Sequence, residues 1–86
     1  MKIEIEKVEK IKEVVNIKLP YYTCWHKTIF YKVYGSGTFD CLRVSESDMG
    51  TTLISSAFSN SVEITEAEFN EAFLKTQQVL LTAFNK

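Results

Sequence analysis

The sequence predicts an α+β fold in which an antiparallel sheet of four or five strands packs on one C-terminal amphipathic helix, as a two-layer sandwich. The length of 86 residues, with 45% hydrophobic residues, three Gly and one Pro, suits one globular domain over residues 1–86. Segments rich in β-branched and aromatic residues come first, and one long helical pattern closes the chain. Strands followed by a single helix favour a helix laid across one face of a sheet.

The first 20 residues carry two alternating patterns with a mixed pattern between them. Ile3 and Ile5 alternate with charged residues, and apolar residues alternate again between Val15 and Leu19. We therefore expect two extended pieces. Residues 7–12 suit a turn or one or two helical turns, because their Glu and Lys side chains can pair in either conformation.

The middle of the chain predicts a β-hairpin. Two segments rich in β-branched and aromatic residues flank Gly35-Ser36-Gly37, and these glycines can supply the positive φ angles of a short turn. A polar stretch then marks a loop. In chain order we expect a strand at 28–34, the turn at 35–37, a strand at 38–44, a loop at 45–50, a strand at 51–58, a turn at 59–61 and a short extended lead at 62–64.

The last element is a helix over about residues 66–84. Thr65 and Glu68 fit a capping box, in which each side chain accepts a hydrogen bond from the backbone N–H of the other. Ile64 and Phe69 fit the hydrophobic staple that accompanies such a cap. Apolar residues then recur at helical spacing in one stripe. The stripe comprises Phe69, Ala72, Phe73, Thr76, Leu80, Ala83 and Phe84, widened on one side by Leu74 and Leu81.

Charge argues against most nucleic-acid-binding proteins. Ten basic and eleven acidic residues give a formal net charge of -1, so the strong positive field that attracts nucleic acids or anionic membranes is absent. Residues 1–43 hold eight of the basic and five of the acidic residues, which predicts a dipolar molecule. Arg43 is the single arginine, whereas bidentate recognition of phosphate or guanine uses several.

The cysteine count and the absence of targeting signals favour a cytoplasmic location. Cys24 and Cys41 are the only cysteines and have no C-x-x-C spacing, whereas small secreted scaffolds carry four or more. The sequence shows no signal-peptide pattern, no transmembrane run and no N-glycosylation sequon. In general style it resembles short bacterial and phage proteins in which strands precede a closing Thr-capped helix.

Candidate catalytic and metal-binding groups are sparse. Cys24, His26 and Cys41 are the only soft or imidazole ligands, too few for a structural zinc site, so we expect no metal and no cofactor. Cys24 lies two residues from His26, a spacing that in a strand places a thiol beside an imidazole. No third group or oxyanion-hole motif accompanies this pair, so we expect no enzyme. A disulfide between Cys24 and Cys41 is geometrically possible if their strands pair.

Aromatic residues are the remaining candidates for function. Seven of the eleven, including all four Tyr and the one Trp, fall between residues 21 and 39. On the strand at 28–34, one face carries Ile29, Tyr31 and Val33, and the other carries Phe30, Lys32 and Tyr34. If the helix covers the first face, Phe30 and Tyr34 stay open to solvent beside Trp25. Exposed aromatic side chains of this kind are enriched at protein interfaces.

We therefore predict a non-enzymatic interaction module that binds another protein or itself, a homodimer included, through an open aromatic sheet face. The candidate binding residues are Trp25, Phe30, Tyr34, Lys32 and Tyr22. The alternative is single-stranded nucleic-acid binding by stacking on the same face, using Tyr21, Tyr22, Trp25, Lys27, Tyr31, Lys32, Tyr34 and Arg43. A Cys24/His26 thiol site ranks third, and no membrane or small-molecule substrate is indicated.

Overall fold

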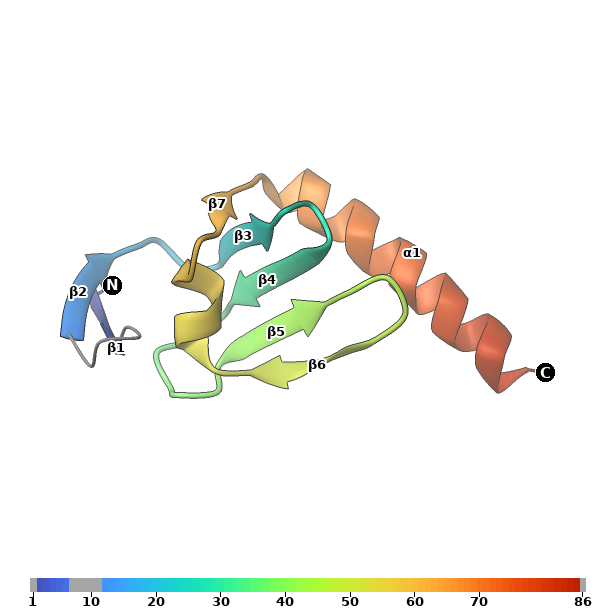
Figure 1. Cartoon of the computed structure of the whole chain (residues 1–86), viewed down its shortest axis with the longest axis horizontal. Coiled ribbons are helices and arrows are strands. Elements are labelled where there is room, and N and C mark those ends of the chain that lie inside the picture. The colour runs from blue at the N-terminus through green and yellow to red at the C-terminus, as the bar shows by residue number, and fades with distance from the viewer. Residues whose placement is uncertain (1, 7–11, 86) are drawn as a thin grey trace.

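The computed structural model describes residues 2–6 and 12–85, with side chains from Ile17 onward, and confirms the predicted α+β two-layer fold (Figure 1). A five-stranded antiparallel sheet has the order β6-β5-β4-β3-β7, and a C-terminal helix packs on it. The elements are β1 (Lys2–Glu6), β2 (Lys12–Asn16), β3 (Tyr21–Trp25), β4 (Ile29–Val33), β5 (Cys41–Val44), β6 (Met49–Thr52), the 3₁₀-helix η1 (Ile54–Phe58), β7 (Val62–Glu63) and α1 (Glu66–Phe84).

The two extended pieces predicted near the N-terminus are confirmed. β1 and β2 pair antiparallel in a sheet of their own, with Ile3 opposite Val15. This small sheet lies at the end of the molecule away from the C-terminus (Figure 1). Of the segment predicted as a turn or helix, Lys12 belongs to β2, and residues 7–11 lie outside the described residues.

The central hairpin is also confirmed, although its glycines act differently from the prediction. β4 and β5 pair antiparallel, with Val33 opposite Cys41. Neither Gly35 nor Gly37 has a positive φ. A Cβ atom on either residue would instead lie less than 3 Å from the Asp40 carboxylate, which accepts a hydrogen bond from the Gly37 N–H at 3.0 Å. Glycine in this turn therefore lets the Asp40 carboxylate lie close against the backbone, and supplies no unusual backbone conformation.

The strand predicted at 51–58 is wrong in its second half. β6 begins at Met49, inside the predicted loop, and ends at Thr52. The chain then forms η1, in which Ile54 and Ala57 are both buried. Residues three apart share one side of a 3₁₀-helix, so these two side chains face the sheet together. Burial against the sheet has overridden the local strand propensity.

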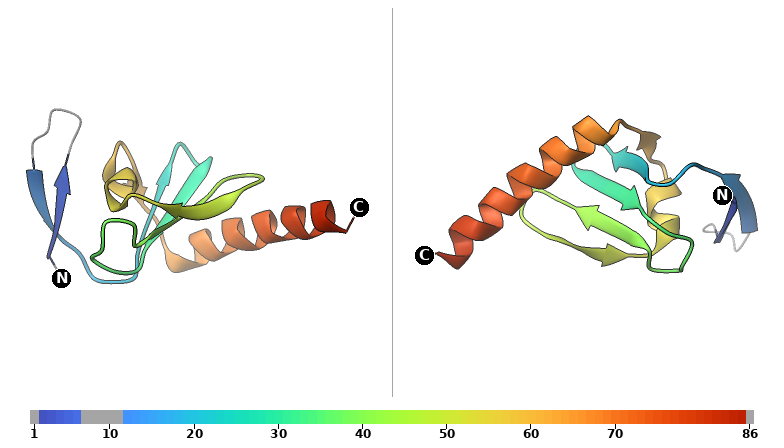
Figure 2. Two further views of the ribbon diagram at one scale, coloured as in Figure 1. Left: turned by 90° about the horizontal axis from the view of Figure 1, so that it is seen from below. Right: turned by 180° about the vertical axis from the view of Figure 1, so that it is seen from behind.

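The terminal helix matches its predicted bounds and cap. The Glu68 N–H donates to Thr65 Oγ1 at 3.2 Å, and the Thr65 N–H donates to Glu68 Oε1 at 3.3 Å. Five residues of the predicted apolar stripe are buried or half-buried: Phe69, Ala72, Phe73, Thr76 and Leu80. Leu74 and Leu81, expected from the sequence to widen the stripe, are exposed instead. Beyond Leu80 the helix extends past the sheet (Figures 1 and 2), and Phe84 is 82% exposed.

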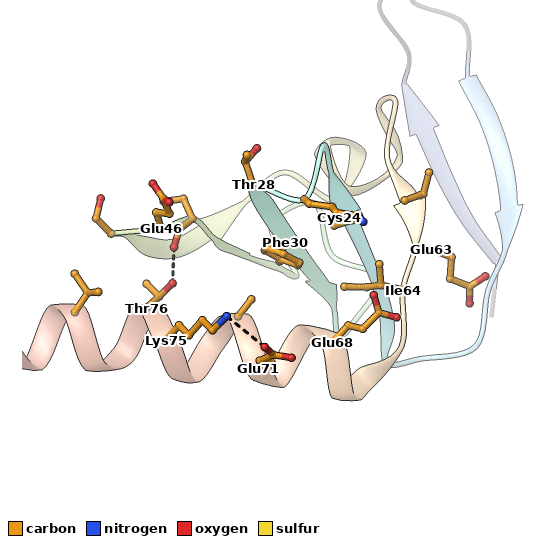
Figure 3. Close-up of a pocket in the computed structure, with 16 residues that line it drawn as sticks. Cys24, Thr28, Phe30, Glu46, Glu63, Ile64, Glu68, Glu71, Lys75 and Thr76 are labelled. Atoms are coloured by element: carbon orange, nitrogen blue, oxygen red, sulfur yellow. Dashed lines mark hydrogen bonds and ion pairs between the residues drawn. The ribbon is translucent and has the colours of Figure 1, made fainter.

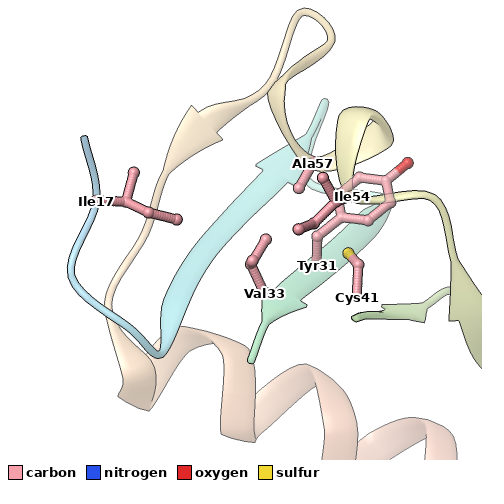
Figure 4. Close-up of a cluster of buried hydrophobic side chains, with 6 residues drawn as sticks. All are labelled: Ile17, Tyr31, Val33, Cys41, Ile54 and Ala57. Carbon is pink, nitrogen blue, oxygen red and sulfur yellow. The ribbon is translucent and has the colours of Figure 1, made fainter. Parts of the chain in front are cut away.

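Both faces of the five-stranded sheet are covered. η1 and Ile17 cover one face, where the buried cluster is Ile17, Tyr31, Val33, Cys41, Ile54 and Ala57 (Figure 4). α1 covers the other face, where Tyr22, Val44 and Phe69 are buried and Phe30 packs against them. The helix therefore lies on the Phe30 face and not on the Tyr31 face. The premise that the Phe30 face stays open is wrong, because a second covering element, η1, takes the Tyr31 face.

Candidate functional site

A groove of about 820 Å³ opens between α1 and the sheet (Figure 3). It is bounded by one flank of α1, the β3–β4 turn, the β5–β6 loop and the β7 segment. Its lining residues are Cys24, Lys27, Thr28, Phe30, Ser45, Glu46, Ser47, Val62, Glu63, Ile64, Glu68, Glu71, Ala72, Lys75, Thr76 and Val79. The groove exists because the long helix meets the sheet at its N-terminal half and leaves the space beside the turn unfilled.

The inner wall of the groove is apolar. Phe30 and Ile64 come from the sheet side, and Ala72 comes from α1; all three are half-buried. Two further apolar side chains, Val62 and Val79, stand at the edge and are exposed. Burying such an apolar surface against a ligand is favourable by about 25 cal/mol of free energy for each Å² of apolar area removed from water.

The rim of the groove is acidic. Four carboxylates face two ammonium groups along the lining: Glu46, Glu63, Glu68 and Glu71 against Lys27 and Lys75. Lys75 pairs with Glu71 at 3.2 Å, and Glu68 serves the helix cap. Glu63 is paired in register with Thr23, whose side chain bonds η1, and its charge acts on Tyr21 on that same face, so its carboxylate points away from the groove (Figure 3). Glu46 is therefore the carboxylate left to meet a ligand.

One partly buried hydrogen bond fixes the helix to the loop that bounds the groove. The Thr76 hydroxyl donates to the carbonyl oxygen of Ser45, 31 residues away in the chain (Figure 3). Thr76 is buried, so leaving its hydroxyl without a partner would be costly. This contact holds α1 at a set distance from the β5–β6 loop, next to Glu46.

The β3–β4 turn brings Lys27 to the mouth of the groove. His26 and Lys27 have φ angles of 49° and 56°, so both occupy the left-handed region. The Thr28 N–H closes the turn on the Trp25 carbonyl at 3.0 Å. Two central residues with positive φ define a type I′ hairpin turn, which usually carries Asn-Gly. His-Lys gives no such signal, which is why sequence reasoning missed this turn.

The five predicted binding residues do not lie on one surface. Tyr22 is 8% exposed and packs on Phe69, with ring centroids 5.3 Å apart. Lys32 places its Nζ 6.0 Å from the centroid of the same Tyr22 ring. Phe30 lies in the groove wall. Of the five, only Phe30 lines the groove.

Trp25 and Tyr34 are exposed by 39% and 47%, but at opposite ends of the hairpin. Trp25 pairs with Ile29 at the start of β4, and Tyr34 follows Val33 at its end. Tyr34 lies five positions after Ile29, which is about 16 Å along the strand. The Trp25 ring instead meets the His26 ring edge-on, at 4.3 Å between centroids.

The aromatic residues of the nucleic-acid alternative are also dispersed. Tyr31 is buried under η1, and Tyr21 stacks on Phe58 at 5.4 Å. Burial raises the pKa of the Tyr21, Tyr22 and Tyr31 phenols above their ordinary value. Arg43 pairs with Asp48 at 2.9 Å. The described aromatic rings thus form no continuous stacking platform.

The thiol pair predicted from spacing is not brought together. Cys24 lies in β3 and is 3% exposed, whereas His26 lies beyond the end of that strand in the turn. The alternation that would place both side chains on one face therefore stops before His26. No hydrogen bond joins the two within the described residues. Cys24 and Cys41 are both free, so the Cys24–Cys41 disulfide is not formed.

The described residues give no sign of a metal centre or a membrane span. Across residues 2–6 and 12–85, no three His, Cys, Asp or Glu side chains are grouped so that they could hold a metal ion. No helix in the same ranges is long and apolar enough to cross a membrane. The chain matches no protein-family model, no curated protein and no solved structure.

Proposed function

We propose that this protein is a non-enzymatic interaction module that holds a basic segment of another protein in the groove beside α1. The observation that carries the proposal is the groove itself, in which an apolar wall around Phe30 and Ala72 is bordered by an excess of carboxylates. The proposal keeps the protein-binding function expected from the sequence and moves it from an open sheet face to this groove.

The size of the groove suits a short peptide. Its helical wall runs from Glu68 to Val79, which spans about 16 Å at 1.5 Å per residue. An extended segment of about five residues has the same length. The volume of about 820 Å³ also falls within the usual range of binding pockets.

The apolar wall and acidic rim of the groove indicate what kind of peptide it would bind. An apolar anchor side chain would displace water from Phe30, Ile64 and Ala72, and a Lys or Arg residue beside it would meet Glu46. The acidic rim also repels nucleic-acid phosphates. We place this activity in the cytoplasm, and the two free buried cysteines support that location.

The test measures binding of two labelled model peptides by fluorescence anisotropy. A Lys-Lys-Leu-Lys-Lys peptide should bind with an affinity that falls as salt rises, and a Glu-Glu-Leu-Glu-Glu peptide should not bind. Peptides this short bind weakly, so the titration extends to ~1 mM protein. Equal binding of the two peptides, or no binding of the Lys peptide at that concentration, contradicts the proposal.

A pair of tryptophan variants locates the site. Ala72→Trp fills the groove and should weaken binding of the Lys peptide by about tenfold or more. Ala67→Trp is the matched control, because Ala67 is exposed on the same helix and does not line the groove. Glu46→Gln removes one rim charge without adding bulk and should weaken binding by a smaller factor, about threefold. Equal effects at residues 67 and 72 would exclude this groove.

A further inference from the structure

The β3–β4 turn holds a lysine in a backbone conformation that disfavours it. His26 and Lys27 have φ angles of 49° and 56°, in the region that favours Gly or Asn. Residues held in such strained conformations cluster at ligand-binding sites, where the side chain has a role beyond the turn itself. Lys27 lines the groove, so its ammonium group is the feature that calls for a role.

Lys27 is the groove cation that has no partner. Of the two ammonium groups along the lining, that of Lys75 is paired with Glu71 at 3.2 Å. Within residues 2–6 and 12–85, no carboxylate pairs with Lys27, and no basic side chain pairs with Glu46. Both side chains are exposed. The groove therefore presents one unpaired positive charge and one unpaired negative charge to a ligand.

The sheet topology sets the distance between these two charges. β3, β4, β5 and β6 are neighbours in chain order, so the β3–β4 turn and the β5–β6 loop lie at the same end of the sheet. Figure 3 shows both across the groove from α1, marked by Thr28 and Glu46. The middles of the turn and the loop are two strand spacings apart, which is about 10 Å. Lys27 and Glu46 thus stand on either side of β4, the strand that carries Phe30.

We propose that Lys27 selects a bound segment that carries an acidic residue as well as a basic one. The preferred segment has a basic, an apolar and an acidic residue next to one another. Its apolar side chain packs on Phe30, its basic group meets Glu46 and its acidic group meets Lys27. Lys27 thereby adds a charge pattern to the proposed function, on which the inference rests.

The geometry of an extended chain fits this pattern. Successive side chains of an extended chain point to opposite sides. When an apolar residue points at the groove wall, its two neighbours therefore point away from the wall, towards the rim. The backbone positions of these neighbours are about 6.5 Å apart, and Lys and Glu side chains can span the remaining distance to Glu46 and Lys27. Three consecutive residues can thus occupy the apolar wall and both charges at once.

The excess of carboxylates on the rim gives the expected preference a diagnostic sign. Four carboxylates and two ammonium groups line the groove. Without a cation that meets the ligand, such a rim favours a neutral residue over an acidic one. A preference for Glu over Gln at the same ligand position therefore requires a positive charge at that position. Lys27 supplies that charge, because the Lys75 ammonium group is already paired.

Binding of matched peptides that are blocked at both ends tests the inference. Fluorescence anisotropy compares Lys-Lys-Leu-Glu-Ala with Lys-Lys-Leu-Gln-Ala at low ionic strength, up to ~1 mM protein. The Glu peptide should bind the native chain about threefold more tightly. The reversed sequences, Ala-Glu-Leu-Lys-Lys and Ala-Gln-Leu-Lys-Lys, are compared in the same way, because an extended chain can enter the groove in either direction. A Gln peptide that binds as well as the Glu peptide, or better, in both orders overturns the inference.

Substitutions at residue 27 assign the preference to one side chain. Lys27→Gln and Lys27→Gly should abolish the preference for Glu, whereas Lys27→Arg keeps the charge and should retain the preference. Lys18→Gln is the matched control, because Lys18 is exposed and does not line the groove. Its preference should stay at about threefold. A preference that survives Lys27→Gln, or that disappears equally in Lys18→Gln, overturns the role of Lys27.

The proposed function and the role of Lys27 can fail separately. Lys27→Gln should bind Lys-Lys-Leu-Lys-Lys at least as tightly as the native chain does, because the substitution removes a like charge from the rim. If that peptide binds but the Glu and Gln peptides bind equally, only the role of Lys27 is overturned. If none of the peptides binds at ~1 mM protein, the proposed function is overturned as well.

Discussion

The two faces of the five-stranded sheet are covered in different ways. On one face, η1 is short enough to lie wholly on the sheet, and Val33, Cys41 and Ala57 have no exposed surface there. On the other face, α1 is fastened at its N-terminal half and then leaves the sheet, so a groove of about 820 Å³ remains beside Phe30 and Ala72. The first face supplies stability, and the second combines stability with room for a ligand.

The largest expected difference in stability between the faces comes from shortening a valine to alanine on each of them. Val33→Ala opens a cavity in the closed η1 face and should lower the free energy of unfolding by about 2–3 kcal/mol. Val79→Ala removes the same atoms from an exposed site at the groove edge and should cost no more than about 0.5 kcal/mol. Urea denaturation measures both. Similar losses would mean that the two faces are packed alike.

A larger side chain should also destabilise the η1 face more than the groove face, but the difference in free energy of unfolding should be smaller than for the valine variants. Ala57→Leu overfills the η1 face and should cost about 1–3 kcal/mol. Ala72→Leu projects into the groove and should change the free energy of unfolding by no more than about 0.5 kcal/mol. Thermal unfolding of the two variants provides the comparison. A loss at residue 72 as large as that at residue 57 would show that the groove has no room for a side chain.

Relief of the strained β3–β4 turn should raise stability by about 1 kcal/mol. Lys27→Gly removes the penalty of a left-handed conformation at a residue with a side chain. Thr28→Gly, one residue further on, serves as the control and should lower stability, because it loses the Thr28 hydroxyl bond to the Trp25 carbonyl. Urea denaturation again gives the readout. Destabilisation by Lys27→Gly would mean that the turn is not strained.

The closed face should also show a pH dependence. Burial raises the pKa of the Cys41 thiol from its ordinary value of 9.0 to about 12. The unfolded chain therefore releases this proton at a lower pH than the folded chain does. The stability that the neutral Cys41 thiol contributes is fully present below about pH 9, and it is lost as the pH rises towards 12. Cys41→Ala should reduce the slope of stability against pH in this window, and an unchanged slope would contradict the account.

The elements that the sequence predicts well are those defined by local patterns. The capping box at Thr65 and Glu68 and the stripe beginning at Phe69 determine where α1 begins and which side it buries. The β4–β5 hairpin follows from two runs of strand-forming residues around a glycine-containing turn. In each case the deciding interactions join residues that are close in the chain.

The features that sequence reasoning missed depend on contacts between distant residues. Residues 54–58 form η1 because Ile54 and Ala57 pack against β4 and Thr23 donates to the Ala57 carbonyl at 2.7 Å. Because η1 covers the Tyr31 face of the sheet, α1 packs on the opposite face, which carries Phe30. The groove brings together four separate segments of the chain, and no local pattern marks it. An aromatic count could identify candidate core residues, but not which of them would be covered.

The most direct test of the central claim compares the two faces while the peptide binds. Ala57 and Ile54 place methyl groups on the η1 face, and Ala72 and Ile64 place the same types of methyl group in the groove. In methyl-labelled protein, the Lys-Lys-Leu-Lys-Lys peptide should shift the NMR signals of Ala72 and Ile64 and leave those of Ala57 and Ile54 in place. Shifts confined to Ala57 and Ile54, or of equal size at all four residues, would contradict the account.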